Sequence, residues 1–346
     1  MEAKPLFYDL NFEEVQSLVK EWGLPSYRAT QIWEGLYAQL VSNLDEFSNL
    51  PKSLRKKLGK NFSFSGLEKV DALASSDGET TKLLFELADG EKIETVLMKY
   101  KKRNTLCISS QAGCAMNCSF CATGQMGFFR NLTAGEIVEQ VLYFARQLKE
   151  NDEVVTNIVF MGMGEPFHNY DAVMKSIEIM NHSEGMNLGA RRFTISTVGL
   201  IPGIKRFTQE NSQVNLAISL HATSNTLRDS MMPVNKRYPI PDLIQACRDY
   251  FEVTHRRVTF EWALIQNVND SVEEAQNLAS LLQGLICHVN VIPLNPTQGF
   301  AGEKSDTQRV MAFKETMEKN GIPCTVRIRR GIDIQAGCGQ LATKHQ

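Results

Sequence analysis

The sequence lacks the features that mark membrane and secreted proteins. No apolar run approaches the ~20 residues of a membrane-spanning helix. The N-terminus, MEAKPLFYDLNFEE, has no basic segment followed by a long apolar one, which argues against a signal peptide. A net charge of −2 over 346 residues argues against a polycation that coats nucleic acid indiscriminately. Without internal repeats or low-complexity segments, we expect a cytoplasmic chain with one large domain and an appendage.

Cysteine is sparse outside one stretch. Four of the eight cysteines lie between Cys107 and Cys121. This clustering is typical of reduced thiols and metal ligands rather than of a disulfide framework. Three scattered cysteines are interpreted as small buried apolar residues: Cys247, Cys287 and Cys324.

The clustered cysteines Cys114, Cys118 and Cys121 are spaced C-x3-C-x2-C, and Cys107 precedes them at the end of a strand-like run. Thiolates at such short separations can converge on one soft metal centre. Three cysteines around a four-iron cube leave one iron open to an outside chelator. The alternative is a structural zinc site with Cys107 as its fourth ligand.

The first hundred residues divide into helical and β-like parts. Asn11 with Glu14 predicts a capped helix start, and further helices are expected after Pro25 and Pro51. The segment Thr81–Met98 reads as two strands joined by Asp89-Gly90, a strong hairpin signal. We therefore predict an accessory domain over residues 1–98 and a main domain over 99–346.

Beyond residue 99, strand-like runs alternate with amphipathic helical ones, which indicates βα units around a parallel sheet. Thr133 with Glu136 predicts a capping box for the first intervening helix. Six units make a partial barrel rather than a closed eight-stranded one, with the active site at the carboxyl ends of the strands. The expected strands are Thr105–Ser109, Asn157–Met161, Arg192–Ser196, Val214–Ser219, Val258–Leu264 and His288–Ile292.

Polar residues follow four of these strands and form a candidate ligand-binding ring. Glycines in Gly162–Pro166 would let a ligand approach the backbone, and Glu165 could accept a hydrogen bond from an amine. Taken alone, that stretch is also compatible with an ordinary turn, and a lone histidine such as His221 is usually structural. The ring consists of Gly164, Glu165, Ser196, Ser219, Leu220, His221 and Asn295.

Two further features stand outside the ring. Cys338 lies between two glycines near the C-terminus, where backbone freedom would let its sulfur move or react. Five basic clusters are spread along the chain, and each alone is more simply a solvated surface than a phosphate contact. They are Lys52, Arg55, Lys56, Lys57 and Lys60; Lys99 to Arg103; Arg191 and Arg192; Arg256 and Arg257; and Arg327, Arg329 and Arg330.

The C-x3-C-x2-C spacing, with Phe120 before its last cysteine, resembles the signature of the radical S-adenosylmethionine (SAM) superfamily. The resemblance implies a [4Fe-4S] cluster on Cys114, Cys118 and Cys121. It also implies that the open iron binds the amino and carboxylate groups of SAM and that an electron from the cluster releases a 5′-deoxyadenosyl radical.

Nearly the whole chain resembles the RlmN/Cfr family of RNA adenine methyltransferases. The likeness rests on ETVLMKY, TLCISSQAGC, RNLTAGEIV, GMGEP, NLGARRFTIST, AISLHA, MPVN, IPLNP and CGQL. It implies a partial (β/α)6 radical-SAM barrel with a small helical N-terminal accessory domain and a β-hairpin linker. It also implies methylation of carbon 2 of an adenine in the peptidyl-transferase centre of 23S ribosomal RNA and of the adenine 3′ to the anticodon in some transfer RNAs.

The same resemblance implies roles for individual residues. One SAM methylates Cys338, and a second supplies the radical that activates this methyl group for addition to the adenine. Glu94 matches the proposed proton acceptor, and Cys107 matches the cysteine that releases the product through a transient disulfide with Cys338. The ring of polar residues matches the SAM contacts, with Gly164 and Glu165 at the amino group. The helical appendage and the basic clusters are assigned to RNA, and flavodoxin or ferredoxin is the expected electron donor.

One segment departs from the family pattern, because Gln335-Ala336-Gly337 replaces the usual Asp-Ala-Ala before Cys338. The glycine gives the loop before Cys338 more backbone freedom. Gln335 has no carboxylate, so this chain lacks any supporting contact that the family's aspartate makes at this position. Two alternatives stay open: a Cfr-type enzyme that methylates carbon 8, and a non-catalytic RNA-binding protein stabilised by zinc.

Overall fold

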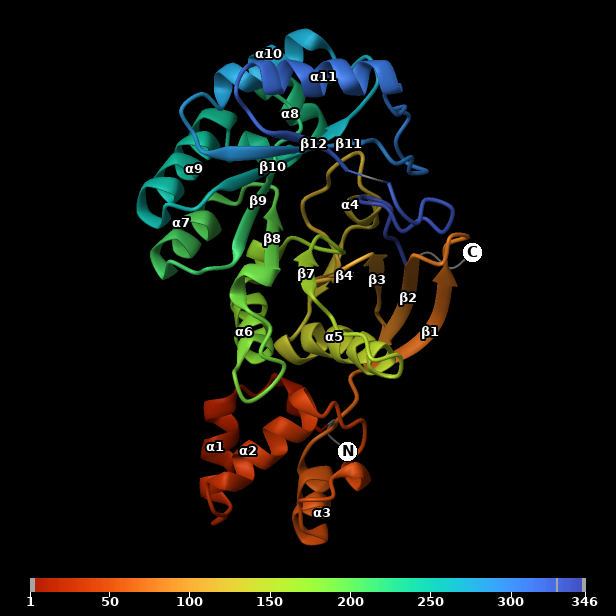
Figure 1. Ribbon diagram of the computed structural model, residues 1–346, viewed down its shortest axis with the longest axis vertical. Coiled ribbons are helices and arrows are strands. Elements are labelled where there is room, and N and C mark those ends of the chain that lie inside the picture. Colours follow the sequence, from red (N-terminus) through yellow and green to blue (C-terminus); the bar gives the residue numbers. More distant parts are fainter. Residues whose placement is uncertain (1–3, 328, 344–346) are drawn as a thin grey trace.

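The computed structural model describes residues 4–343 except residue 328, and it combines a helical N-terminal part with a larger α/β body (Figure 1). The helices predicted after Asn11, Pro25 and Pro51 are confirmed, and Asn11 and Glu14 form the predicted capping box. The N-terminal part consists of α1 (Phe12–Glu21), α2 (Tyr27–Trp33) and α3 (Lys52–Asn61), with the short turns η1 (Phe7–Asp9), η2 (Glu34–Ala38) and η3 (Leu44–Glu46).

A single ten-stranded sheet forms the α/β body. Its spatial order is β1 (Leu67–Ala74), β2 (Thr80–Leu87), β3 (Lys92–Tyr100), β4 (Arg103–Cys107), β7 (Asn157–Phe160), β8 (Phe193–Thr197), β9 (Asn215–Ser219), β10 (Val258–Leu264), β11 (Cys287–Pro293) and β12 (Cys324–Val326). In this spatial order, neighbouring strands from β4 onward run parallel to one another. The first three strands, β1, β2 and β3, are antiparallel to their neighbours.

The six predicted parallel strands are confirmed, and the sheet curves into the expected partial barrel with its helices outside (Figure 1). Thr133 and Glu136 form the predicted capping box. The covering elements are α5 (Ala134–Lys149), α6 (Tyr170–Asn181), α7 (Ile201–Glu210), α8 (Asn225–Met231), α9 (Ile240–Thr254), α10 (Val272–Leu281) and α11 (Thr307–Lys319), with the short turns η4 (Pro166–Asn169), η5 (Ala190–Arg192) and η6 (Pro233–Lys236).

The predicted hairpin at Asp89-Gly90 joins β2 and β3, with Gly90 at a positive φ of 87°. Rather than standing apart as a linker, it continues the barrel sheet through β4. Two strands of this sheet escaped prediction, because β1 is largely exposed and β12 has only three residues. The division between residues 98 and 99 stays a prediction, and it falls inside β3.

The N-terminal part is fixed to the barrel mainly through α5. Arg146 donates to the Leu40 and Val41 carbonyls and to the Tyr8 hydroxyl. Glu139 accepts from the Gly66 N–H at 2.7 Å, and one continuous hydrophobic core extends through both parts. Among the described helices, none has the length and apolar character needed to cross a membrane.

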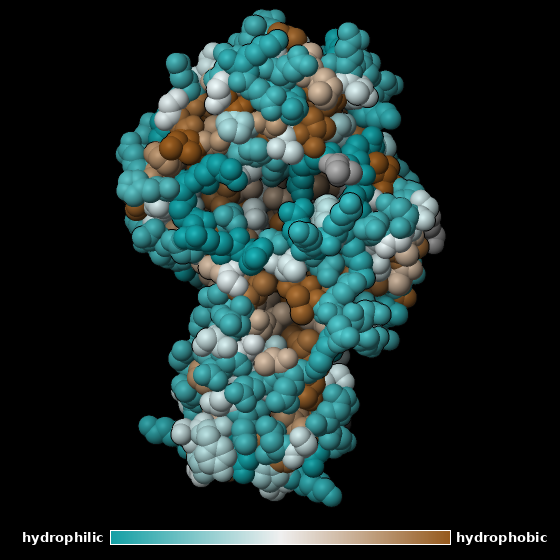
Figure 2. Space-filling view, viewed as in Figure 1, coloured by the Kyte–Doolittle hydropathy of each residue, from teal (hydrophilic) through white to brown (hydrophobic). Residues whose placement is uncertain are grey.

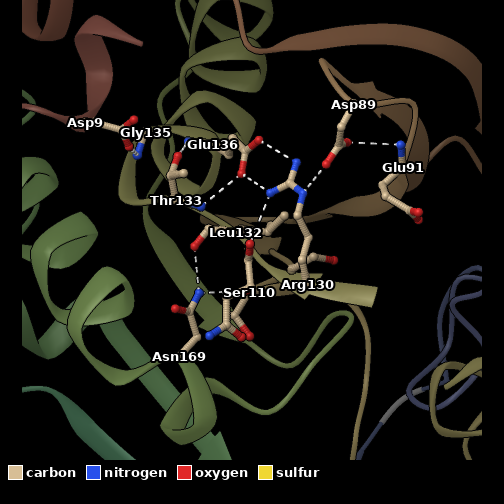
Figure 3. Close-up of polar contacts among 12 residues, drawn as sticks. Asp9, Asp89, Glu91, Ser110, Arg130, Leu132, Thr133, Gly135, Glu136 and Asn169 are labelled. Carbon is tan, nitrogen blue, oxygen red and sulfur yellow. Dashed lines mark hydrogen bonds and ion pairs between the residues drawn. The ribbon is translucent and has the colours of Figure 1, made fainter. Parts of the chain in front are cut away.

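A small two-stranded ribbon, β5 (Gln111–Gly113) and β6 (Phe128–Asn131), frames the cysteine loop and α4 (Ala122–Met126). Arg130 fastens this ribbon by pairing with Asp89 in the β2–β3 turn and with both carboxylate oxygens of Glu136 on α5 (Figure 3). The body is hollowed between β8 and α4, with apolar residues in its depth and hydrophilic ones around the rim (Figure 2).

Candidate active site

The cysteine loop, residues 114–121, lies between β5 and α4. Cys114 donates its backbone N–H to the Gly127 carbonyl at 2.7 Å, and Cys121 donates to the Cys118 carbonyl at 3.2 Å. Gly124 packs so closely that a Cβ there would lie 2.9 Å from the Cys118 backbone. The loop is therefore folded tightly, with Cys114 and Cys118 buried and Cys121 half-buried.

The three thiols fit the cluster that the motif implies. Burial raises the pKa of Cys114 to about 12 and also raises the pKa values of Cys118 and Cys121, so a bound cation is needed to hold them as thiolates. Over residues 4–343 without 328, no group of three His, Cys, Asp or Glu side chains is close enough for a single metal ion. In a cluster each thiolate binds a different iron, and three soft sulfur ligands on one short loop are the donor set that such a cluster takes.

The first cavity opens beside this loop, at the carboxyl ends of the strands. It brings together Cys118, Cys121 and Cys338 with most of the predicted ring. The ring members that line it are Gly164, Glu165, Ser196, Ser219, His221 and Asn295. The sequence-based grouping of these strand ends is thus matched by their positions.

Gly164 and Glu165 form the wall of this cavity after β7. Gly164 has a φ of 102°, and a Cβ there would lie 2.6 Å from Gln111, so only glycine fits. Glu165 accepts backbone N–H groups from Phe167 at 3.0 Å and Val198 at 2.8 Å. Burial raises its pKa to about 7. The carboxyl group is held rigidly and keeps further acceptor capacity toward the cavity.

The ends of β8 and β9 supply the next part of the wall. The hydroxyl oxygens of Ser196 and Ser219 lie 3.4 Å apart. His221 accepts the Ala263 N–H on Nδ1, and burial lowers its pKa to about 3, so a neutral ring faces the cavity. Leu220 differs from its neighbours because its side chain is buried in the core and does not line the cavity.

A buried guanidinium group supports these strand ends. Arg228 on α8 is fully buried and donates to the carbonyls of Val198, Ser219 and Leu220 and to the amide oxygen of Asn235. Every acceptor is neutral, and burial lowers the pKa of the Arg228 guanidinium to about 10. Arg228 therefore locks the backbone behind Ser219 and beside Cys118.

Cys338 is exposed, and it lines both the first cavity and a second one. Asn295 donates to the Cys338 carbonyl at 3.1 Å, and Ala122 donates to the Gly339 carbonyl at 2.7 Å. Because Asn295 also accepts from Arg329, both ends of its amide are used to hold the Cys338 segment. A Cβ at Gly337 would lie 2.5 Å from Asn295 Nδ2, which accounts for glycine in this chain's Gln335-Ala336-Gly337.

The second cavity contains both Cys107 and Cys338. Burial and then the neighbouring Cys338 raise the pKa of Cys107 to about 12. All eight cysteines are free, so the structure does not contain the disulfide expected between these two. Arg327 lines both cavities and lies 3.5 Å from the buried Glu261 carboxylate.

Glu94 is buried and lines neither of the two cavities. Its carboxylate pairs with Lys82 at 2.8 Å and accepts the Ala342 N–H at 2.9 Å. Burial raises its pKa against the effect of Lys82. It shares a face of β3 with Met98, which does line the second cavity.

Two family models match the chain: the radical SAM superfamily over residues 108–279 and the N-terminal domain of ribosomal RNA large subunit methyltransferases over residues 7–63. The probable dual-specificity RNA methyltransferase RlmN of Chloroflexus aurantiacus is 46% identical over 349 residues, covering 98% of this chain and 93% of that protein. The chain belongs to the RlmN family.

Other relatives agree with this membership. The ribosomal RNA large subunit methyltransferase N of Nitrosopumilus maritimus is 46% identical, covering 97% of this chain and 98% of its own. The crystal structure of a radical SAM methyltransferase from Sphaerobacter thermophilus is 50% identical with a TM-score of 0.96, covering 98% of this chain and all of that one. Membership in the RlmN family makes the chain a radical SAM methyltransferase and removes the non-catalytic zinc alternative.

Several residues in and behind the cavity wall of this RlmN-family chain were not predicted. Glu261 stands in the apolar run VTFEWAL, where a charged residue within a buried strand is a signal of a functional position. Gln111, which accepts the N–H of Glu165 54 residues away, and Arg228, which reaches the Val198 carbonyl 30 residues away, carry no comparable signal.

Proposed function

We propose that this chain methylates carbon 2 of an adenine in the peptidyl-transferase centre of 23S ribosomal RNA and of the adenine 3′ to the anticodon in some transfer RNAs. The observation that carries the proposal is the position of Cys338, which lines the cavity beside the cysteine loop and also the cavity that contains Cys107. A methyl group on its sulfur would be accessible to the SAM-derived radical from the first cavity and to the RNA base from the second.

The chemistry gives a reason for this arrangement. Carbon 2 of adenine is electron-poor and has no lone pair with which to attack the SAM methyl group. When bound, the cluster and SAM supply the electron and the adenosyl radical that activates the methyl group on Cys338. Cys338 carries that methyl group, and Glu94 accepts the ring proton. Cys107 then attacks the Cys338 sulfur: the S–S bond forms as the sulfur–carbon bond to the RNA breaks, and the electron pair of that bond stays with the methylated base, which takes up a proton. An external thiol reductant restores both cysteines.

The remaining roles follow from positions in the first cavity. Gly164 and Glu165 would hold the SAM amino group, while Ser196, Ser219 and His221 contact its ribose, carboxylate or adenine. Leu220 and Asn295 would act indirectly, by packing and by holding the Cys338 segment. The domain at residues 1–98 would contact RNA, a flavodoxin or ferredoxin would supply electrons, and the enzyme would work in the cytoplasm.

Nucleoside mass spectrometry tests the proposal. Reconstituted protein is incubated anaerobically with SAM, reductant and unmodified ribosomal or transfer RNA, and the products are compared with 2-methyl- and 8-methyladenosine. We expect 2-methyladenosine from both RNAs. Only 8-methyladenosine would identify a Cfr-type enzyme, and no methylated product from protein with an intact cluster would refute the proposal.

A further inference from the structure

One buried arginine near the cysteine loop has no carboxylate partner. In the part of the chain that the structure describes, no ion pair includes Arg228 on α8. Burial of an unpaired charge is costly, so a position that retains one is a candidate for an electrostatic role. All the hydrogen-bond acceptors of this fully buried side chain are neutral oxygens, on Val198, Ser219, Leu220 and Asn235.

The neighbouring groups leave this charge uncompensated. Asp229, the next residue in the chain, is half-exposed and accepts from the other end of the Asn235 amide at 2.7 Å, so solvent screens much of its charge. Arg327 in the wall of the first cavity differs, because the Glu261 carboxylate lies 3.5 Å from it. Burial lowers the pKa of Arg228 to about 10, and the group therefore stays positively charged at neutral pH.

The same helix holds the cysteine loop. Met231, three residues after Arg228 on α8, accepts the Ser119 N–H at 2.9 Å, and its side chain packs in one apolar cluster with Cys118. Residues three apart share one face of a helix, so Arg228 and Met231 both face the loop. Burial, the other two thiols and Glu165 raise the pKa of Cys118, and the charge of Arg228 acts against them.

A positive charge at this position favours reduction of the cluster that the family implies. Three thiolates around an oxidised four-iron core of charge 2+ carry about one net negative charge, and one electron from the external reductant makes it two. A nearby cation stabilises the more negative form more strongly, and the low dielectric constant of the interior increases the effect.

We propose that Arg228 is a positioning residue that raises the reduction potential of the cluster, because it holds an unpaired positive charge beside Cys118 while its hydrogen bonds fix the ends of β8 and β9. This inference goes beyond the proposed function, since it concerns the electron that reaches the cluster and not the carbon that is methylated. An enzyme that methylated carbon 8 would need the same electron.

The test is the reduction potential of the reconstituted protein, measured without SAM or RNA by a redox titration followed with electron paramagnetic resonance. Arg228→Met keeps an extended side chain without the charge, and Arg228→Lys keeps the charge with fewer donors. For Arg228→Met we expect the equilibrium constant for reduction to fall about tenfold, which is about 59 mV for one electron. A unit charge at about 10 Å and an effective dielectric constant of about 20 has roughly this effect.

The pair of variants separates charge from packing. We expect Arg228→Lys to stay close to the wild-type potential, because a merely structural role would lower the potential of both variants alike. Equal falls in the two variants would therefore overturn the proposal, and so would a wild-type potential in Arg228→Met.

Arg146→Met is the matched control. Arg146 also donates to neutral oxygens, those of Leu40, Val41 and Tyr8, but it fixes the N-terminal part and lines neither cavity. We expect it to leave the reduction potential unchanged. A fall equal to that of Arg228→Met would overturn the proposal, because the loss of any inward-facing arginine would then have the same effect.

Iron content and urea unfolding are measured first, since Arg228→Met leaves four acceptors without their donor. If this variant does not hold iron, Arg228→Gln replaces it, because its amide keeps donors and carries no charge; the same fall is expected, and a wild-type potential would overturn the proposal. The titration contains no RNA and is decided separately from the nucleoside analysis. A fall in potential in a protein that forms no methyladenosine would support the role of Arg228 and refute the proposed function.

Discussion

The cysteine loop and the Cys338 segment, residues 329–343, are both built around cysteine, but different contacts hold them. In the loop, Cys121 donates to the Cys118 carbonyl three residues away and Cys114 to the Gly127 carbonyl thirteen residues away, and a single longer backbone contact joins Ser119 to the Met231 carbonyl. The Cys338 segment depends on remote partners, since Glu94 accepts from Ala342 and Asn295 donates to Cys338. Local contacts leave a compact motif in the sequence, whereas remote ones leave isolated residues.

The largest expected difference between the two regions is in the iron content of their cysteine variants. Cys118→Ala should lose the cluster and all RNA methylation, because two thiolates hold the cube poorly. Cys338→Ala should keep its iron and its brown colour and also lose all RNA methylation. Iron analysis, visible spectra and nucleoside mass spectrometry measure these outcomes, and methylation retained by Cys338→Ala would refute the proposed methyl carrier.

A substitution at Glu94 tests whether this anchor of the Cys338 segment also acts as a base in the reaction. If Glu94 is the base, Glu94→Gln should slow RNA methylation by about 10² to 10⁴ with Cys338 methylation unchanged. Because burial raises its pKa, the wild-type rate should rise with pH as this carboxyl ionises, and the variant should lack that rise. A pH–rate profile shared by both proteins would instead assign Glu94 to anchoring alone.

A substitution at Asn295 tests whether the Cys338 segment must be held in position for its reaction. Asn295→Ala removes the donor to the Cys338 carbonyl and the acceptor for Arg329, so the segment should shift. A displacement near 1 Å costs about 10²-fold in rate, which we expect for Cys338 methylation. Iron content should stay at the wild-type value, and a loss of iron would show that the two regions are not independent.

Gly337→Ala should have the smallest effect. Its Cβ would lie 2.5 Å from Asn295 Nδ2, so the segment must adjust. We expect a loss of about 1 kcal/mol in the free energy of unfolding, as for mild overpacking. Urea unfolding measures it, with Gly189→Ala as a control at an open position whose φ of −56° suits alanine. A neutral or stabilising result would show that Asn295 moves freely.

Sequence alone determined the parts of this protein that depend on near neighbours. The C-x3-C-x2-C spacing, the capping boxes at Asn11 and Thr133, the Asp89-Gly90 hairpin and the six parallel strands were all readable, because spacing and local propensity decide short loops, caps and periodic elements.

Only the tertiary structure decided how separate segments combine. It placed Cys107 and Cys338 in one cavity, paired Glu261 with Arg327, and set Arg103 and Arg330 over Tyr100. These residues carry no shared period or spacing, since their contacts arise only when the sheet curves and the C-terminal segment crosses its open side. Buried polar groups acquire their partners from that packing rather than from their neighbours in the chain.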